Sequence, residues 1–423
     1  MDDSQSVPGR SVQPVIVTRP GHSISRQDID PNALKVVFRL HRLGFTAYVT
    51  GGAVRDLLLG RPAKDFDVVT DARPGQIKKR FAHAYVIGRR FRLVHVHFSG
   101  GKIIEVATFR RPVEQAEENA PNGENPPPSP YGTPEEDAFR RDITINALFY
   151  DVVNDAVVDY VGGLEDLARR MVRVIGDPAE RFREDPVRIW RVLRHAARLG
   201  FAVEGTAERE IAVHAHLLAA CSGARLYEEM NKDLAHETGP VMTALRRAGI
   251  LRHIFGKAGE AYEADGRLFS ELSSILEAVD RAKTVGVPLS LGEMYAALFW
   301  PWAKPVFGLS GVDFHKVLSD TLREAGMRIN IPRSLRADFS QVLIIVAAME
   351  RALRTGNMRW SLTRRPLFGE ATRLQSLIFK GRPPEKGETF EVLFRQAFPA
   401  GGPERGRRRR RPRRRRPDRD KPL

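Results

Sequence analysis

Apolar residues in the first part of the chain recur at spacings that alternate between helical and extended. Leu34, Val37 and Phe38 follow helical spacing up to Gly44. The segment TAYVT that comes next is typical of a short strand and runs into two glycines, and AVRDLLL after them predicts a helix. The pattern therefore predicts a strand, a glycine turn and a helix in direct succession.

The same mixture of patterns continues to about Phe109. Strands are predicted at 65–70 (DFDVVT), 93–98 (LVHVHF) and 102–109 (KIIEVATF), with a helix at 74–81. Helices and strands that alternate in this way indicate an α/β unit.

Beyond this unit the character of the chain changes twice. Residues 112–134 hold seven prolines and four Glu but no Lys or Arg, which predicts a mobile acidic surface loop. A hairpin is expected at 152–163, and helical patterns rich in Leu, Ala and Arg continue to about residue 395. These patterns divide the chain into a flexible arm (1–24), a head (25–162), a helical neck (163–230), a helical body (231–398) and a disordered Arg-rich tail (399–423).

The net charge of +16 is unevenly distributed. Residues 404–423 carry eleven Arg and one Lys against one Glu and two Asp, a net charge of +9, which leaves +7 for the other 403 residues. A strongly basic chain indicates a polyanionic partner, with nucleic acid as the first choice and an acidic membrane as the second. Hydrophobic residues make up 42% of the chain, which excludes wholesale disorder and a membrane bundle.

Cysteine content and the absence of a signal-like leader favour the reducing cytoplasm. The only cysteine, Cys221, has no partner for an internal disulfide, and the chain begins MDDSQSVPGR. The most apolar run, at 342–349, is much shorter than the roughly 20 residues of a membrane-spanning helix. We therefore expect no membrane span.

The glycine turn and the strand after it carry the first candidate chemistry. Gly51 and Gly52 allow the backbone to approach a ligand closely, and Arg55 on the following helix is placed for a phosphate contact. Asp65 and Asp67 stand two apart on a predicted strand, so both carboxylates are expected on one face. Paired carboxylates suit Mg²⁺ that is shared with substrate phosphates, although a solvated strand edge is the common alternative.

Two further groups of polar residues are weighed against structural roles. Glu105 is a further carboxylate for the metal if its strand lies beside that of Asp67. Asp185, Arg188 and Arg191 fall at three-residue spacing opposite the apolar stripe of a predicted helix, where an acceptor and a forked donor suit the edge of a base. The alternative for these arginines is an ordinary solvated helix face.

Four ordered motifs resemble one known family. The runs GGAVRDLLLG with KDFDVVT, EEDAFRRDITINALFYD, DYVGGLEDL and EDPVRIWRVLRHAARLGF are similar to the bacterial class of the nucleotidyltransferase superfamily, which holds CCA-adding enzymes and poly(A) polymerases. The resemblance implies an α+β head of the polymerase β type followed by an all-α neck, body and tail. It also implies a template-independent transfer of nucleotides from ATP to RNA 3′ ends with Mg²⁺ as the cofactor.

The resemblance also assigns roles to single residues. Asp65 and Asp67 match the metal-binding carboxylates, and Asp142 matches a third active-site acid that supports the metal or orients Arg141. A phosphate-binding turn is matched by Gly51, Gly52 and Arg55. In the helical part, Glu184, Asp185 and Arg188 match a motif that reads the Watson–Crick edge of the incoming base, and Arg191 matches a nucleotide contact. A buried ion pair is the structural alternative for Arg141 and Asp142.

The resemblance is closer to the poly(A) polymerase branch. The lead-in HSISRQDIDPNAL, the segment GRRFRLVHV, the run REDPVR and the Arg-rich end carry this likeness. An Arg-rich tail suits an enzyme that extends arbitrary RNA ends, because phosphate neutralisation needs no sequence recognition. CCA addition to tRNA remains the first alternative, and a catalytically inactive RNA-binding protein the second. The sequence identifies no protein partner.

Overall fold

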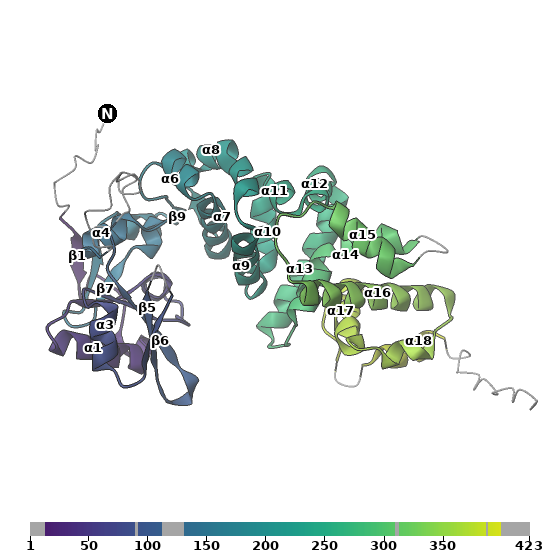
Figure 1. Cartoon of the computed structure of the whole chain (residues 1–423), viewed down its shortest axis with the longest axis horizontal. Helices are drawn as coiled ribbons and strands as arrows, with labels where there is room; N and C mark the ends of the chain where they lie inside the picture. Colours follow the sequence, from purple (N-terminus) through teal and green to yellow (C-terminus); the bar gives the residue numbers. More distant parts are fainter. Residues whose placement is uncertain (1–12, 89–91, 112–130, 309–312, 386–387, 399–423) are drawn as a thin grey trace, which may run out of the picture. The chain divides into compact units, whose positions relative to one another are not determined.

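A computed structural model describes residues 13–88, 92–111, 131–308, 313–385 and 388–398 (Figure 1). Three sequence-based expectations fall wholly or partly outside these ranges. They are the first half of the arm (1–12), most of the Pro-rich loop (112–130) and the Arg-rich tail (399–423).

Within the described residues, the N-terminal part is built on one eight-stranded sheet with the order β1-β8-β7-β2-β3-β6-β5-β4. Only the central pair, β3 and β6, is parallel, and its neighbours pair antiparallel. The strands are β1 (Val15–Thr18), β2 (Ala47–Thr50), β3 (Asp67–Thr70), β4 (Ala84–Ile87), β5 (Leu93–His97), β6 (Ile103–Thr108), β7 (Phe149–Asp151) and β8 (Ala156–Asp159).

Alternation along the central strands separates two sets of side chains. Val68 and Val106, paired across β3 and β6, are buried on the face covered by helix α1 (Pro31–Arg42), which packs against β2 and β3. Val69 and Phe149 lie on the other face, in a hydrophobic cluster that also includes Ala138 of helix α4 (Pro134–Phe139). Asp67 stands two residues before Val69 and so opens onto this second face, at the beginning of its strand.

The expected flexible arm is wrong for residues 15–18. Val15–Thr18 form strand β1, which pairs antiparallel with β8, so that Val15 lies opposite Asp159. Val15 and Ile16 remain 59% and 58% exposed because β1 is an edge strand that is held by backbone hydrogen bonds. Since neither face of the strand is well buried, its sequence shows no apolar alternation.

Helices make up almost all of the regular structure after β8, apart from the short parallel pair β9 (Met171–Val172) and β10 (Ala202–Val203) (Figure 1). The other helices of the head are α2 (Gly52–Leu58) and α3 (Pro74–Arg80). Those that follow are α5 (Gly163–Ala168), α6 (Pro178–Glu184), α7 (Val187–Leu199), α8 (Gly205–His214), α9 (Gly223–Leu234), α10 (Thr238–Arg247), α11 (Leu251–Phe255), α12 (Lys257–Ala264), α13 (Gly266–Thr284), α14 (Leu291–Ala303), α15 (Phe314–Glu324), α16 (Arg333–Thr355), α17 (Phe368–Lys380) and α18 (Phe390–Ala397).

The chain divides into two compact units. The first unit contains the residues up to Phe269 together with Arg323–Ile331, and the second unit contains Ser270–Leu322 and the residues from Pro332 onward. The sequence predicted a boundary between neck and body at residue 230, and this position lies inside the first compact unit. Helix α10, just beyond that point, packs against α7 and α9, and the first unit continues through α11 and α12 to Phe269.

A buried ionic network fastens α7 to α9 inside the first unit. The Arg194 guanidinium on α7 donates to the carboxylates of Glu229 and Asp233 on α9, and the Trp190 indole N–H donates to Asp233 Oδ2 at 2.6 Å. Asp233 is fully buried, and Arg194 is 4% exposed. A buried charge is stable only when it is paired, so these carboxylates depend on Arg194.

A search of the described helices finds none with the length and apolar character needed to cross a bilayer.

We expect Arg194→Met to lower the free energy of unfolding by about 3–5 kcal/mol, because it leaves Asp233 and Glu229 buried without their main cation. Chemical denaturation followed by tryptophan fluorescence measures this loss, since Trp190 lies in the network. The control is Arg209→Met on α8, an exposed arginine whose guanidinium bonds only the Thr206 hydroxyl among the hydrogen bonds of the described residues. Equal stability of the two variants would show that the network contributes little.

Candidate active site

The sheet brings two carboxylates and a histidine into one row on its second face. Asp67 on β3 lies directly opposite Glu105 on β6, and Glu105 lies opposite His95 on β5. His95 Nε2 is 3.4 Å from Glu105 Oε1. On the other side of Asp67 the register partner is Thr50, the last residue before the glycine turn. The adjacency on which a role for Glu105 depended is therefore present.

Asp65 lies just before β3, whereas the sequence predicted that it would be on the strand. Phe66 between the two acids is 6% exposed, and Asp65 and Asp67 are both exposed. Exposed and buried side chains thus continue to alternate from Asp67 back to Asp65, although Phe66 and Asp65 are not part of β3. Both carboxylates therefore face solvent at the N-terminal end of β3.

The surroundings of Asp67 disfavour its ionised form. The surrounding protein reduces hydration of its carboxyl and, together with Glu105 and Asp65, raises its pKa from 3.8 to about 6, while Arg141 opposes this shift. The side chain remains accessible to solvent, so a ligand can reach it. A divalent cation would relieve the repulsion among these carboxylates.

The glycine turn lies against the same acid. Gly51 has φ 77° and ψ −145°, a conformation that side-chain-bearing residues rarely adopt. A Cβ at this position would stand 3.7 Å from Asp67 Oδ2 and 3.9 Å from Arg141 Nη1. At Gly52 a Cβ would meet the Arg55 guanidinium at 3.4 Å. The backbone of Gly51 therefore lies close to both Asp67 and Arg141, and that of Gly52 lies close to Arg55.

Arg55 does not extend toward the open side of the turn. It is 9% exposed, and it donates to Asp56 Oδ1 at 2.9 and 2.7 Å and to Asn146 Oδ1 at 2.6 Å. Since the Asn146 oxygen faces Arg55, its amide nitrogen faces His195 Nε2, 3.2 Å away. An amide nitrogen only donates, so His195 must be neutral to accept. The guanidinium of Arg55 is therefore bonded to Asp56 and Asn146 of the protein itself.

Arg141 is the arginine that faces Asp67, and a buried carboxylate holds it there. Asp137 on α4 is fully buried and accepts from Arg141 Nε at 3.1 Å and Nη2 at 2.9 Å. The remaining nitrogen of Arg141, Nη1, donates to the Asn146 carbonyl at 3.0 Å. The guanidinium also lies over the Phe149 ring, 5.3 Å from its centroid. Contacts with Asp137, Asn146 and Phe149 therefore fix the orientation of the Arg141 guanidinium.

Asp142 is placed differently from the expectation that it supports the metal or orients Arg141. Its carboxylate accepts from Arg188 Nε at 2.9 Å and pairs with Arg191 Nη1 at 2.6 Å, both on helix α7. The charged groups that contribute most to the raised pKa of Asp67 are Glu105, Arg141, which opposes the shift, and Asp65. Asp142 thus binds the neck helix, and Asp137 takes the role of orienting Arg141.

The remaining residues of the base-reading motif also have internal partners. Arg188 Nη1 donates to Glu184 Oε2 at 2.8 Å, and Asp185 Oδ2 accepts from Arg225 Nη2 of α9 at 2.8 Å. Asp185 ends α6 and Arg188 stands in the first turn of α7, so the bend between these helices puts the acceptor beside the donor. The structure brings Asp185, Arg188 and Arg191 together at this bend.

Sequence reasoning missed Asp137, Asn146 and Arg225, and it ranked Asp142 above Glu105. Strand register decides the place of Glu105, and a chain contains no local signal for register between β3 and β6. For Asp137 a signal existed, because Arg140 and Arg141 follow it at three- and four-residue spacing on a short helix.

Known proteins match both the head and the helical part of the chain. A family model described as the poly A polymerase head domain matches residues 47–173, and one described as "Probable RNA and SrmB- binding site of polymerase A" matches residues 200–260. Poly(A) polymerase I of Salmonella typhi is 38% identical over 379 residues, covering 86% of this chain and 81% of that protein. The chain belongs to the bacterial poly(A) polymerase family. It is therefore an enzyme of the nucleotidyltransferase class.

CCA-adding enzymes match over less of the sequence but share the fold. The enzyme of Bacillus pumilus is 37% identical over 201 residues, 48% of this chain and 49% of that protein. The structure of the Bacillus stearothermophilus CCA-adding enzyme in complex with CTP has a TM-score of 0.55 and 25% identity, covering 87% of this chain and 93% of that chain. The expected fold, an α+β nucleotidyltransferase head followed by helices, is confirmed.

Nucleotidyltransferase polymerases of this kind generally use divalent metals, and the carboxylates fit such an ion. Among the residues that the structure describes, no three His, Cys, Asp or Glu side chains gather as a closed metal cage. Asp65 and Asp67 instead form an open pair of hard oxygen donors. Mg²⁺ is commonly bound by one or two carboxylates with water and substrate phosphates completing its coordination, so an open pair suits it.

His195 should make the stability of the first unit depend on pH. Burial, followed by the positive charges of Arg55, Arg194, Arg191 and Arg198, holds its pKa well below 6.5. Below pH 6.5, His195 binds a proton in the unfolded chain but not in the folded chain. The free energy of unfolding therefore falls as pH falls, by up to about 1.4 kcal/mol per pH unit.

We therefore expect His195→Gln, which can still accept from Asn146, to lose less stability than the unmodified chain on acidification. Thermal unfolding between about pH 7.5 and about pH 5.5 measures the difference. His216→Gln is the matched control, because it removes an exposed histidine of the same unit and leaves His195 in place. Parallel pH profiles for His195→Gln and the unmodified chain would contradict the neutral, buried state.

Proposed function

We propose that this chain is a template-independent polynucleotide adenylyltransferase that adds AMP from ATP to RNA 3′ ends and releases pyrophosphate. The observation that carries the proposal is the Asp65–Asp67 pair, flanked by Glu105 and Arg141, in a chain that matches poly(A) polymerase I over most of both sequences. A chain with a single cysteine fits work in the reducing cytoplasm.

The acid pair is the proposed metal site. Asp65 and Asp67 would hold Mg²⁺, which supplies charge neutralisation for the triphosphate and lowers the pKa of the attacking 3′-hydroxyl. Glu105, the register partner of Asp67, adds negative charge beside the pair but does not gather with it as a third ligand among the described residues. In this proposal Asp142 serves the neck helix.

The glycine turn and Arg141 are the proposed triphosphate site. The backbone of Gly51 lies close to both Asp67 and Arg141, since a Cβ there would be 3.7 Å from Asp67 Oδ2 and 3.9 Å from Arg141 Nη1. The 3′-hydroxyl oxygen forms a bond to the α-phosphorus and gives its proton to solvent, while the bond from the α-phosphorus to the oxygen bridging it to the β-phosphorus breaks and pyrophosphate leaves with that oxygen. Arg141 stabilises negative charge that develops in this step, because Asp137 already holds it in position.

Asp185, Arg188 and Arg191 are the proposed reader of the base. The Asp185 carboxylate accepts from the adenine amino group, and Arg188 donates to the ring nitrogen beside it. Cytosine presents the same donor and acceptor pair, so hydrogen bonding alone does not select adenine. Selection then requires that the two side chains be held at one spacing, and Arg225 and Asp142 hold them.

CCA addition to tRNA is the alternative with the same chemistry. It is supported by the shared fold and by the ambiguity of the base-reading pair, but the match to the Bacillus pumilus enzyme covers only about half of this chain. A catalytically inactive RNA-binding protein is the alternative of another class. Against it stand two accessible carboxylates in an environment that raises the pKa of Asp67.

RNA is proposed to bind along the helical part and the tail. Residues 200–260 match the model described as an RNA-binding site, and residues 404–423 carry a net charge of +9. Arginine-rich segments neutralise phosphates without reading sequence, which suits a substrate of varied 3′ ends.

Asp67→Asn and Asp65→Asn should each lower the rate of AMP addition by roughly a hundredfold or more, because each removes charge from the metal site while keeping the side chain's shape. Purified protein, an unstructured oligoribonucleotide, Mg²⁺ and one nucleoside triphosphate at a time form the assay. Long A tails from ATP alone are expected from the unmodified chain.

Asp71→Asn is the matched control, since Asp71 is an exposed acid immediately after the same strand, and it should retain activity. Full turnover by either site variant would disprove the assignment of the acids. Addition of C and then A restricted to tRNA would favour the CCA alternative, and absence of pyrophosphate release with every RNA and nucleotide would favour the inactive one.

Arg225→Ala should release Asp185 and lower kcat/KM for ATP roughly tenfold, the equivalent of about 1.4 kcal/mol for a charge-assisted hydrogen bond. The preference for ATP over CTP should fall with it, because Asp185 loses its fixed position. Steady-state kinetics with both nucleotides measure the change, with Arg209→Ala as the control. An unchanged ratio of ATP to CTP efficiency would remove Arg225 from base selection.

A further inference from the structure

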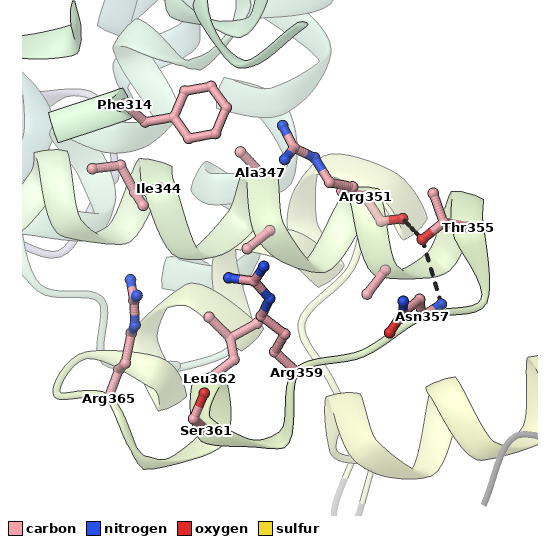
Figure 2. Close-up of a pocket in the computed structure, with 12 residues that line it drawn as sticks. Phe314, Ile344, Ala347, Arg351, Thr355, Asn357, Arg359, Ser361, Leu362 and Arg365 are labelled. Atoms are coloured by element: carbon pink, nitrogen blue, oxygen red, sulfur yellow. Dashed lines mark hydrogen bonds between the residues drawn. The ribbon is translucent and has the colours of Figure 1, made fainter. Parts of the chain in front are cut away.

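A cavity of about 580 Å³ opens within the second unit, far along the chain from the acid pair. Helix α16 forms one side, the segment that follows it forms the other, and Phe314 at the start of α15 completes the wall (Figure 2). The volume falls in the usual range for small-molecule sites, about 300–1,000 Å³. The cavity thus has room for a ligand with a ring system.

The lining combines an apolar floor with cations. Small or aliphatic side chains, among them Ala347 and Leu362, form the floor, and three arginines reach the cavity: Arg351, Arg359 and Arg365. Figure 2 shows that Arg359 and Arg365 extend from the segment after α16 toward that helix. Among the described residues that line the cavity, none is Asp or Glu. No carboxylate of the lining therefore offsets the positive charge of the three arginines.

One arginine is already held as part of an aromatic wall. The Arg351 guanidinium lies over the Phe314 ring at 5.0 Å from the centroid, and Arg351 Nη2 donates to the Phe307 carbonyl at 3.0 Å. A stacked guanidinium and phenyl ring form a surface against which a flat ring can lie. Arg359 and Arg365 are exposed and stand at the same opening, where a phosphate would find forked donors.

A nucleotide combines the two chemical features that this lining selects. Its base is flat and stacks on aromatic and guanidinium surfaces, while its phosphate is an anion that arginine binds bidentately. An aliphatic anion would use the charge but not the wall of Phe314 and Arg351, and an uncharged aromatic compound would leave the arginines unused. The small side chain of Ala347 leaves the floor open to the ring.

We propose that this cavity is a second nucleotide-binding site, which holds one nucleotide while the acid pair acts on another. Its ligand is either one nucleotide of the RNA chain or a free mononucleotide, and the choice of RNA as a source rests on the proposed function. An enzyme that extends RNA without a template gains from such a site, because stacking on one base holds the polymer with little dependence on sequence.

Binding measurements on the full chain test this site with two probes, a short fluorescent oligoadenylate and AMP. Arg359→Ala combined with Arg365→Ala should weaken oligoadenylate binding about tenfold if the ligand is a nucleotide of RNA. Ala347→Trp should weaken it comparably by filling the cavity. If the ligand is a free nucleotide, calorimetry should show loss of one AMP site in the double variant, while oligoadenylate binding stays unchanged.

Arg354→Ala is the matched control, since Arg354 is exposed near the end of the same helix and is not a lining residue. It should alter binding of either probe by no more than about twofold. Unchanged binding of both probes in the double variant, or an equal loss in Arg354→Ala, would overturn the second site. Thermal unfolding of Ala347→Trp shows whether that variant folds, and the surface double variant remains decisive if it does not.

Failure of this site and failure of the proposed function are separable. With oligoribonucleotide at saturating concentration, the double variant should add a single AMP at the unmodified rate, because it leaves Asp65 and Asp67 untouched. If the unmodified chain adds no AMP at all, the adenylyltransferase proposal fails. The binding data still decide the cavity.

Discussion

The buried carboxylate of Asp137 is the constraint on which the active-site side of the head depends. It is excluded from water, so it must be paired, and its two oxygens accept from Arg140, Arg141 and the Arg110 backbone N–H. These bonds leave Arg141 a single direction, toward the Asn146 carbonyl and Asp67. A surface arginine at the same place would lose conformational entropy whenever it bound phosphate.

The residues that follow Asp137 tie the head to the neck. Carbonyl oxygens of Arg140 and Arg141 accept from Arg181 Nη2 at 2.8 and 2.9 Å, and the next residue, Asp142, binds Arg188 and Arg191. One short segment therefore contacts the acid site through Arg141 and the arginines Arg188 and Arg191 of α7 through Asp142. The bonds of Arg188 Nε to Asp142 and of Arg188 Nη1 to Glu184 fix the position of this guanidinium at the head–neck junction.

The positive charge of the chain performs several distinct tasks. Arg55 and Arg194 are buried and serve carboxylates or amides of the protein itself. At the head and neck, Arg188 and Arg191 are shared between Asp142 and the proposed base. Arg359 lines a cavity without acidic residues among its described walls. Net charge indicates a polyanionic partner, but only the neighbours of each arginine show which ones remain available to it.

Local patterns were sufficient for most of the fold. The strand and helix around the glycine turn, the change to helices after the hairpin and the buried stripe of α7 all follow from spacing along short segments. Strand β1 escaped detection because an exposed edge strand needs no apolar alternation. The boundary between the compact units also escaped, since α10 is a helix of ordinary composition whose partners lie elsewhere in the chain.

The sequence by itself determined the fold class, the family, and the candidate residue types at the site, because these depend on motifs whose members are close in the chain. Tertiary structure alone decided that Glu105 lies beside Asp67, that Asp142 binds α7, and that Arg55 points inward. Each of these outcomes depends on strand register or on the packing of distant helices. Such pairings join residues that are separated by tens of positions, and no local spacing specifies them.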